Sequence, residues 1–203
     1  MPAPRLILAS ASPSRRRMLE QAGLVFTVEP SGVDEDEIKR SLLGERATPQ
    51  DIAEKLAEMK ALRVSARHPE AMVVGADSTL ACSGRMFDKP PSMEAARQQL
   101  LALRGQTHEL FSSVVVAKAN ARLWHCTERG RLTMRDFTEP FLDAYLARTG
   151  EGVLASVGAY QLETLGVHLF ARIDGDYFTI LGLPLLPLLS FLAVHGIGLE
   201  HTA

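Results

Sequence analysis

The chain has 203 residues, of which 46% are hydrophobic and 23% are charged, and this balance excludes an intrinsically disordered protein. Its 22 basic residues nearly match its 24 acidic residues, so the formal net charge is −2 and a basic surface dedicated to nucleic acid is not expected. A chain of this length can bury a large core without disulfides or a structural metal, which predicts one domain over residues 1–203 or two closely joined lobes.

Capping residues and apolar patterns predict an alternation of helices and strands. Helices are expected where Ser or Thr, often followed by Pro, precedes apolar residues at helical spacing. Strands are expected in short apolar runs and where apolar and polar residues alternate. In chain order, the expected elements are strand 5–9, helix 13–22, strand 26–29, helix 48–66, strand 72–76, helix 92–104, strands 108–118 and 123–134, helix 138–148, strands 167–173 and 177–181, and helix 184–195. This order predicts an α/β fold, a mixed sheet with flanking helices.

Three further segments are interpreted from their composition. The acidic residues 34–37 predict an exposed connection, and residues 174–176 (Asp-Gly-Asp) predict a hairpin turn between the last two strands. Residues 177–194 carry no charge, which satisfies the length of a membrane span, but Gly182 and Pro184 interrupt them. A buried strand followed by a core helix is therefore expected there, with no membrane association.

Cysteine usage and the first residues of the chain indicate a cytoplasmic protein. Cys82 and Cys126 are far apart and match neither a CxxC pair nor a zinc-binding spacing, which favours free thiols in a reducing compartment. The apolar run that ends before Ser10 is too short for the hydrophobic region of a signal peptide. We therefore expect the protein in the cytoplasm.

A polar segment follows the first predicted strand and carries groups that suit an anion. Ser10, Ser12, Ser14 and Arg15 lie at a strand-to-helix junction, where free main-chain N–H groups and the positive end of the helix dipole favour negative charge. The three consecutive arginines that begin at Arg15 point about 100° apart on a helix, so they cannot all contact one ligand. An anion site and a capped helix with solvated arginines are both open at this point.

The other candidates are charged residues near predicted strand and helix ends. Asp77 follows the apolar run of the third strand, where α/β enzymes hold a metal or activate water, although a turn aspartate bonded to its own loop would show the same pattern. Glu35, Lys60 and Lys89, taken singly, are typical of solvated loops and helix faces. Glu163 lies in a segment rich in Gly and aromatic residues that suits either a ligand or a strand edge.

Taken together and in this order, these segments resemble the Maf family of nucleotide pyrophosphatases. The matching segments span nearly the whole chain: 6–13 (LILASASP), 33–35 (VDE), 56–61 (LAEMKA), 75–77 (GAD), 89–90 (KP), 105–108 (GQTH), 158–160 (GAY) and 182–184 (GLP). The resemblance implies a mixed α/β fold with a deep cleft between two lobes, similar to that of the inosine triphosphatases, and often a homodimer.

The same resemblance implies an activity and the residues that carry it. Members of the family hydrolyse a nucleoside triphosphate to the monophosphate and pyrophosphate with a divalent cation such as Mg²⁺ or Mn²⁺. The expected catalytic residues are Asp77 as proton acceptor, Glu35, Lys60 and Lys89, and the polar cleft also contains Ser10, Ser12 and Arg15. Glu35 and Asp77 are the expected metal ligands, because hard cations prefer carboxylate oxygens. The basic side chains would stabilise the charge that develops on the phosphate oxygens.

Departures from the family patterns concern the nucleotide base. Members that prefer dTTP and UTP carry Arg, Thr and a GAYGIQG loop where this chain has Ser14, Ser78 and residues 161–164 (QLET). The 7-methyl-GTP members carry Trp, Gln and Glu, and only Glu163 agrees with them. A carboxylate could accept from N–H donors on a guanine edge, whereas an amide could serve a pyrimidine edge. The preferred base therefore stays open between these two types, with a slight preference for a modified or non-canonical nucleotide.

Two other functions are compatible with part of the pattern. The first is a non-catalytic nucleotide-binding regulator of cell division that uses the same cleft, but an anion sensor would need cations more than it needs Asp77. The second is a nucleic-acid-binding module, but the chain lacks both a basic excess and interleaved aromatic and basic residues. A nucleoside triphosphate is therefore the expected partner.

Overall fold

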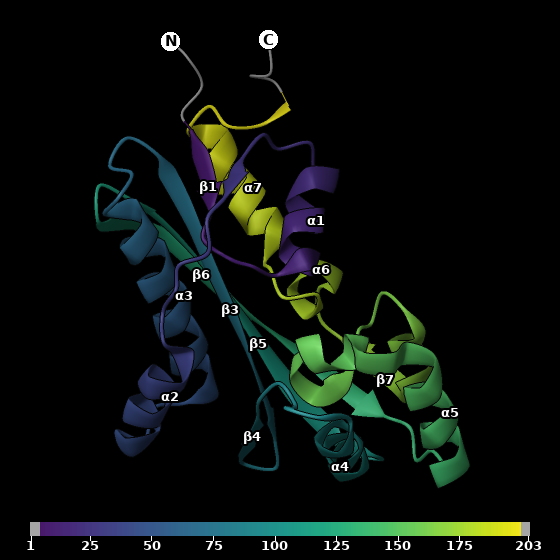
Figure 1. Ribbon diagram of the computed structural model, residues 1–203. Helices are drawn as coiled ribbons and strands as arrows, with labels where there is room; N and C mark the ends of the chain where they lie inside the picture. Colours follow the sequence, from purple (N-terminus) through teal and green to yellow (C-terminus); the bar gives the residue numbers. More distant parts are fainter. Residues whose placement is uncertain (1–4, 200–203) are drawn as a thin grey trace.

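The computed structural model describes residues 5–199 and shows a seven-stranded mixed sheet with helices on both faces (Figure 1). The strands are β1 (Leu6–Leu8), β2 (Thr27–Val28), β3 (Met72–Cys82), β4 (Arg85–Phe87), β5 (Thr107–Lys118), β6 (Ala121–Met134) and β7 (Phe170–Asp174). The helices are α1 (Pro13–Gln21), α2 (Glu35–Gly44), α3 (Pro49–Ser65), α4 (Met93–Leu103), α5 (Glu139–Thr149), α6 (Tyr177–Ile180) and α7 (Leu185–Val194). Short 3₁₀ helices cover Gly150–Ala155, Val157–Ala159 and Leu165–Leu169. The predicted mixed α/β fold is confirmed.

The pairing of the strands leaves the middle of one edge of strand β3 without a partner strand. The strand order is β2-β1-β3-β5-β6-β7, with β4 paired to β3. The pairs of β1 with β2 and with β3 are parallel, and the others are antiparallel. On one edge of β3, β1 covers residues 72–74 and β4 covers residues 80–82. In the described part of the chain no strand covers residues 75–79 on that edge, so their main chain borders the space between β1 and β4.

The two faces of β3 pack against different helices (Figure 1). Gly75 and Asp77 face α3, where a Cβ atom on Gly75 would lie 2.6 Å from the main-chain nitrogen of Ala61. Because Gly75 has no side chain, α3 can approach the strand closely. Ala76 and Ser78 point to the opposite face, toward α1. The alternation of a strand therefore places neighbouring residues in two different chemical environments.

The two largest hydrophobic clusters lie at opposite ends of the sheet, and two smaller ones lie between α3 and the sheet. One cluster joins α1 and α7 to β1 and to the first halves of β3 and β6. Another joins α4, α5 and the 3₁₀ segments to the far halves of β3, β5 and β6, and Figure 1 shows these elements gathered at the opposite end of the sheet. The division is compatible with two lobes around a cleft, which stays a prediction.

The helices predicted from their caps are confirmed. The hydroxyl of Thr48 accepts from the main-chain N–H of Asp51 at 3.2 Å, and the Asp51 carboxylate accepts from the Thr48 N–H at 3.0 Å, which completes the predicted capping box of α3. The hydroxyls of Ser12, Ser92 and Thr138 each accept from a main-chain N–H three residues later and so cap α1, α4 and α5. These signals were reliable because each depends only on residues within one turn.

The predicted exposed connection at residues 34–37 is wrong. The carboxylate of Asp34 accepts from the main-chain N–H of Glu37 at 3.0 Å and caps α2, which begins at Glu35. Acidic side chains in a first turn interact favourably with the positive end of the helix dipole. The acidic run is therefore the start of a helix, and Glu35 stands on a regular element.

The predicted final hairpin is also wrong. Asp176 accepts from the main-chain N–H of Thr179 at 2.9 Å and caps the short helix α6, where a strand over residues 177–181 was expected. The preceding strand begins at Phe170 because a 3₁₀ helix occupies Leu165–Leu169. An Asp-Gly-Asp segment suits a hairpin turn and a helix cap equally well at the level of local chemistry.

The remaining differences concern β3 and the closing helix. The third strand extends from Met72 to Cys82, so Asp77 lies in its middle and not at its end as expected. The strand continues because β5 pairs with it through Ala81. The uncharged stretch ends in α7, which has 10 residues, and none of the helices within residues 5–199 is long and apolar enough to span a membrane.

Candidate active site

A cavity of about 740 Å³ opens at the uncovered edge of β3. All ten residues predicted for the site line it: Ser10, Ser12, Ser14, Arg15, Glu35, Lys60, Asp77, Ser78, Lys89 and Glu163. They come from the β1–α1 junction, α2, α3, β3, the segment after β4 and the loop before β7. The cavity therefore brings together segments that lie far apart in the sequence.

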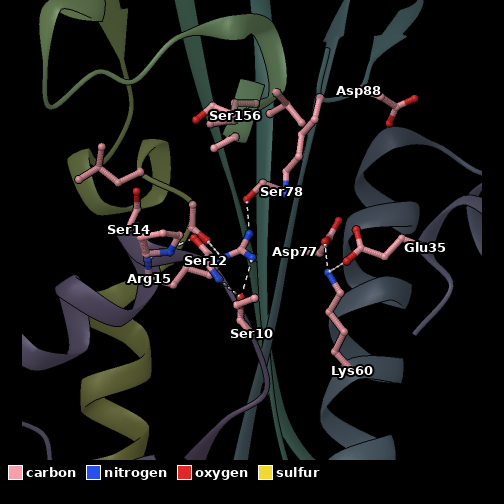
Figure 2. A pocket seen from close by; sticks show the side chains of 18 of the residues that line it. Ser10, Ser12, Ser14, Arg15, Glu35, Lys60, Asp77, Ser78, Asp88 and Ser156 are labelled. Atoms are coloured by element: carbon pink, nitrogen blue, oxygen red, sulfur yellow. Dashed lines mark hydrogen bonds and ion pairs between the residues drawn. The ribbon is translucent and has the colours of Figure 1, made fainter. Parts of the chain in front are cut away.

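A buried lysine joins two carboxylates on one side of the cavity. The Lys60 ammonium lies 2.5 Å from Asp77 Oδ1 and 2.7 Å from Glu35 Oε1, and Figure 2 shows both side chains converging on it. The side chains of Lys60 and Asp77 are each 7% exposed. Burial alone would raise the pKa of Glu35, but the charge and hydrogen bond of Lys60, with the charges of Lys39 and Lys89, lower it overall. Glu35 is therefore ionised near neutral pH.

Asp77 has one carboxylate oxygen bound and one free. Oδ1 accepts from Lys60, whereas Oδ2 is buried and has no hydrogen-bond partner among residues 5–199. A buried oxygen of this kind costs free energy unless a bound molecule or ion satisfies it. Oδ2 of Asp77 therefore has acceptor capacity that a molecule or ion in the cavity could satisfy.

A second group is built around Arg15 (Figure 2). Its guanidinium donates through Nε to the main-chain oxygen of Gly182 at 2.8 Å, through Nη1 to Ser10 Oγ at 3.3 Å and through Nη2 to Ser78 Oγ at 3.0 Å. Arg15 is buried, whereas Arg16 pairs with Glu20 at the surface. This confirms that neighbouring arginines on α1 cannot all face one ligand, and three of the five Arg15 donors are already occupied by protein.

The β1–α1 junction owes its shape to hydroxyl groups. Ser10 Oγ accepts from the main-chain N–H of Ser12 at 3.2 Å, and Ser12 Oγ accepts from the N–H of Arg15 at 3.4 Å. Ser14 instead donates its hydroxyl to Glu163 Oε1 at 3.0 Å, across 149 positions of the sequence. This hydrogen bond connects the β1–α1 junction to the loop before β7.

The structure adds cavity residues that sequence reasoning missed. Lys39 on α2 lies 2.8 Å from Asp88, and both line the cavity together with Asp36. A signal for Lys39 existed in its spacing of four from Glu35, which places two side chains on one helix face. This spacing was not used because residues 34–37 were expected to form a loop, where a spacing of four places no two side chains on one face.

The formal charge of the cavity is slightly negative. Four basic side chains (Arg15, Lys39, Lys60, Lys89) and five acidic ones (Glu35, Asp36, Asp77, Asp88, Glu163) line it, which leaves a charge of −1. A ligand with several negative charges would meet repulsion unless cations accompany it. Among residues 5–199 no group of three or more His, Cys, Asp or Glu side chains is arranged to hold a metal ion.

Comparisons with known proteins place this mixed α/β chain in a family. A model described as "Maf-like protein" matches residues 5–195, and the chain therefore belongs to the Maf family. It is 56% identical to a nucleoside triphosphate pyrophosphatase of Paramagnetospirillum magneticum, over 94% of this chain and 98% of the relative.

Other relatives carry a more specific name. The chain is 49% identical to a 7-methyl-GTP pyrophosphatase of Rhizobium etli, over 95% of this chain and 97% of the relative. It is 47% identical to a 7-methyl-GTP pyrophosphatase of Brucella abortus, over 92% and 94% of the two chains. A crystal structure of a dITP/XTP pyrophosphatase from Mycobacterium abscessus aligns with a TM-score of 0.36 at 16% identity, covering 74% of this chain and 96% of that one, a likeness too distant to carry an argument.

Proposed function

We propose that the protein is a nucleoside triphosphate pyrophosphatase, which hydrolyses the bond between the α- and β-phosphates and releases the monophosphate and pyrophosphate. The observation that carries the proposal is the orphaned Oδ2 of Asp77 in a cavity of nucleotide size. The names of relatives with 47–56% identity support it. A non-catalytic nucleotide sensor is less well supported, because an anion sensor would need cations more than it needs Asp77.

In this proposal Asp77 accepts the proton of the attacking water. Lys60 binds Oδ1 and so holds the carboxylate in place, which leaves Oδ2 as the basic atom. Lys89 lines the cavity and has no ion-pair partner in the described part of the chain, so its ammonium is available to the phosphates. Charge develops on the phosphate oxygens during the reaction, and cations fixed beforehand stabilise it.

We further propose that Glu35 and Asp77 hold a divalent cation, Mg²⁺ or Mn²⁺. Mg²⁺ is commonly bound by one or two carboxylates together with substrate phosphates and waters. The ionised Glu35 carboxylate fits a direct ligand, whereas Asp77 would hold the cation through a water, so that its Oδ2 stays free to accept a proton. When bound, the cation neutralises charge on the phosphate oxygens. It also offsets the formal charge of −1 of the cavity, which otherwise disfavours a triphosphate.

The base is proposed to lie near Ser14 and Glu163. The Glu163 carboxylate accepts from Ser14 in the structure, and it has further acceptor capacity for N–H donors of a guanine edge. The relatives named for 7-methyl-GTP support a purine of this kind. A dTTP- or UTP-like substrate remains the alternative, with a modified or non-canonical nucleotide slightly preferred. The cytoplasm is the expected location, and a homodimer is a state that the family resemblance allows.

A nucleotide panel tests the activity directly. Purified protein is incubated with canonical and modified nucleoside triphosphates and Mg²⁺ or Mn²⁺, and pyrophosphate and orthophosphate are assayed separately. We expect pyrophosphate, and we expect Asp77→Asn to lower kcat by about 10²-fold or more because it removes the proton acceptor. Glu35→Gln should also lose most of the turnover.

Asp174→Asn provides a matched control, because Asp174 lies on exposed β7 and pairs with Arg172 away from the cavity. Release of orthophosphate alone would indicate a different phosphatase reaction. Near-normal pyrophosphate release by folded Asp77→Asn protein would remove Asp77 from the role of base. Tight nucleotide binding without turnover under any metal would favour the regulatory function instead.

A further inference from the structure

Two ion pairs connect helix α2 to other segments of the molecule. None of the helix residues is buried. Glu35 reaches Lys60 on α3 at 2.7 Å, and Lys39, one turn later, reaches Asp88 after β4 at 2.8 Å. Residues spaced by four share one helix face, and both of these side chains line the cavity. The helix therefore presents one acidic and one basic group to the ligand space.

The cations of the cavity differ in how firmly the protein holds them. Arg15 is bonded to Ser10, Ser78 and Gly182, and Lys60 is enclosed between two carboxylates. Lys39 has a single carboxylate partner, Asp88. Among the paired cations of the cavity, Lys39 is thus the one that can change partner at the smallest loss.

The exposure of the two partners shows which of them can leave. The Lys39 side chain is 15% exposed, whereas that of Asp88 is 64% exposed. An exposed carboxylate that turns toward solvent is readily rehydrated, and surface ion pairs contribute little stability. The ammonium, by contrast, stays at the cavity, where burial lowers its pKa but Asp88, Asp77 and Glu35 raise it overall. Lys39 therefore remains charged there.

We propose that Lys39 is a further phosphate-binding residue, and that a polyphosphate chain displaces Asp88 from it on binding. The proposal rests on the proposed function only in taking a polyphosphate as the ligand class. A phosphate oxygen forms a short, charge-assisted bond with a lysine ammonium. Asp88 keeps Lys39 paired while the cavity is empty, and it competes with the ligand for the same ammonium.

A double-mutant cycle separates this role from a structural one. The probe is inorganic tripolyphosphate, and its Kd is measured by isothermal titration calorimetry with Mg²⁺ held constant. Lys39→Met should weaken binding by about tenfold, the loss of one charge-assisted contact. Asp88→Asn should tighten it by a few fold, because the competitor is gone. If the ion pair served only to hold α2 in place, both variants would weaken binding.

The double variant excludes a general effect of charge. With Lys39→Met present, Asp88→Asn should bring no gain, since the ammonium it would release is absent. A gain of the same size in both backgrounds would show that Asp88 acts only through its long-range charge, and it would overturn the proposal. Lys39→Arg should retain most of the affinity, because Arg also donates to phosphate.

Lys55→Met is the matched control, because Lys55 forms an exposed ion pair with Glu58 outside the cavity at 2.9 Å. It should leave the Kd unchanged. Failure of the wild-type protein to bind tripolyphosphate would overturn the proposal as well. Binding of tripolyphosphate with the expected cycle but without turnover of any nucleotide would support Lys39 and count against the proposed enzyme activity, so the two failures are distinguishable.

Discussion

Lys60 and Asp77 form a buried ion pair whose two members depend on each other. The pair is bonded at 2.5 Å, and each side chain is 7% exposed. Removing charged groups from water is costly, so a buried pair adds little net stability, but the loss of one partner leaves an uncompensated charge in the interior. The geometry of the site and the stability of the fold are therefore coupled at these two residues.

Lys60→Met should lower the free energy of unfolding by about 3 kcal/mol near neutral pH, because Asp77 and Glu35 then face each other without a cation. The double variant Lys60→Met/Asp77→Leu should recover a large part of that loss. Denaturant unfolding measures both values, with Lys55→Met as the exposed control. An equal loss in the single and double variants would contradict the coupling.

The contact between α3 and β3 explains the glycine of the Gly-Ala-Asp segment. A Cβ atom on Gly75 would collide with the main-chain oxygen of Ala57 and would lie 2.6 Å from the nitrogen of Ala61. Main-chain atoms of a helix cannot move aside as a flexible side chain can. The missing side chain thus sets the distance between helix and strand, and with it the reach of Lys60 to Asp77.

Gly75→Ala should therefore cost about 1–3 kcal/mol of stability through overpacking, and it should lower activity as well, because α3 carries Lys60. Gly152→Ala is the control, since a Cβ atom there meets nothing within 4 Å. Thermal unfolding and kcat are measured for both variants. A Gly75→Ala protein with wild-type stability and activity would show that α3 can shift without consequence.

Local sequence signals predicted some helices correctly and failed for others. Caps such as Thr48 predicted α3 correctly because the signal and its consequence lie within one turn. The same kind of signal was misread at Asp34 and Asp176, because the acidic run after Asp34 was interpreted as an exposed connection and the residues after Asp176 as a strand. In both places contacts with distant segments complete the helix: Glu35 with Lys60, and Thr179 with Glu128.

Across the whole molecule, one buried histidine makes the fold sensitive to acid. His108 lies in the largest core, where its Nε2 is bonded to the Tyr160 hydroxyl at 2.8 Å. Burial lowers its pKa from 6.5 to about 4. In the unfolded chain the imidazole binds a proton below about pH 6.5, whereas in the folded protein it stays neutral until about pH 4.

Stability contributed by neutral His108 is therefore complete above about pH 6.5 and is lost as the pH falls toward about 4. The loss should be on the order of 3 kcal/mol. Chemical denaturation at a series of pH values measures it, and His108→Gln should flatten the dependence between about pH 7 and about pH 5. The pKa of Glu35 is lowered, so the stability that its carboxylate contributes is lost only when the pH falls below the ordinary pKa of Glu, and this pH range lies below that of His108. A variant with an unchanged slope would show that His108 is not the group responsible.

The sequence alone determined the fold class, most helix starts and ten of the residues that line the cavity. Caps, apolar periodicity and short motifs depend on neighbouring residues, and the Maf resemblance rested on the order of such motifs. Tertiary structure alone decided that β1 and β4 leave one edge of β3 unpaired over residues 75–79, that Lys60 lies between Glu35 and Asp77, and that Lys39 meets Asp88. These features depend on how elements far apart in the chain pack together. The distance between two side chains on different elements is set by the positions of both elements, and local sequence patterns do not give those positions.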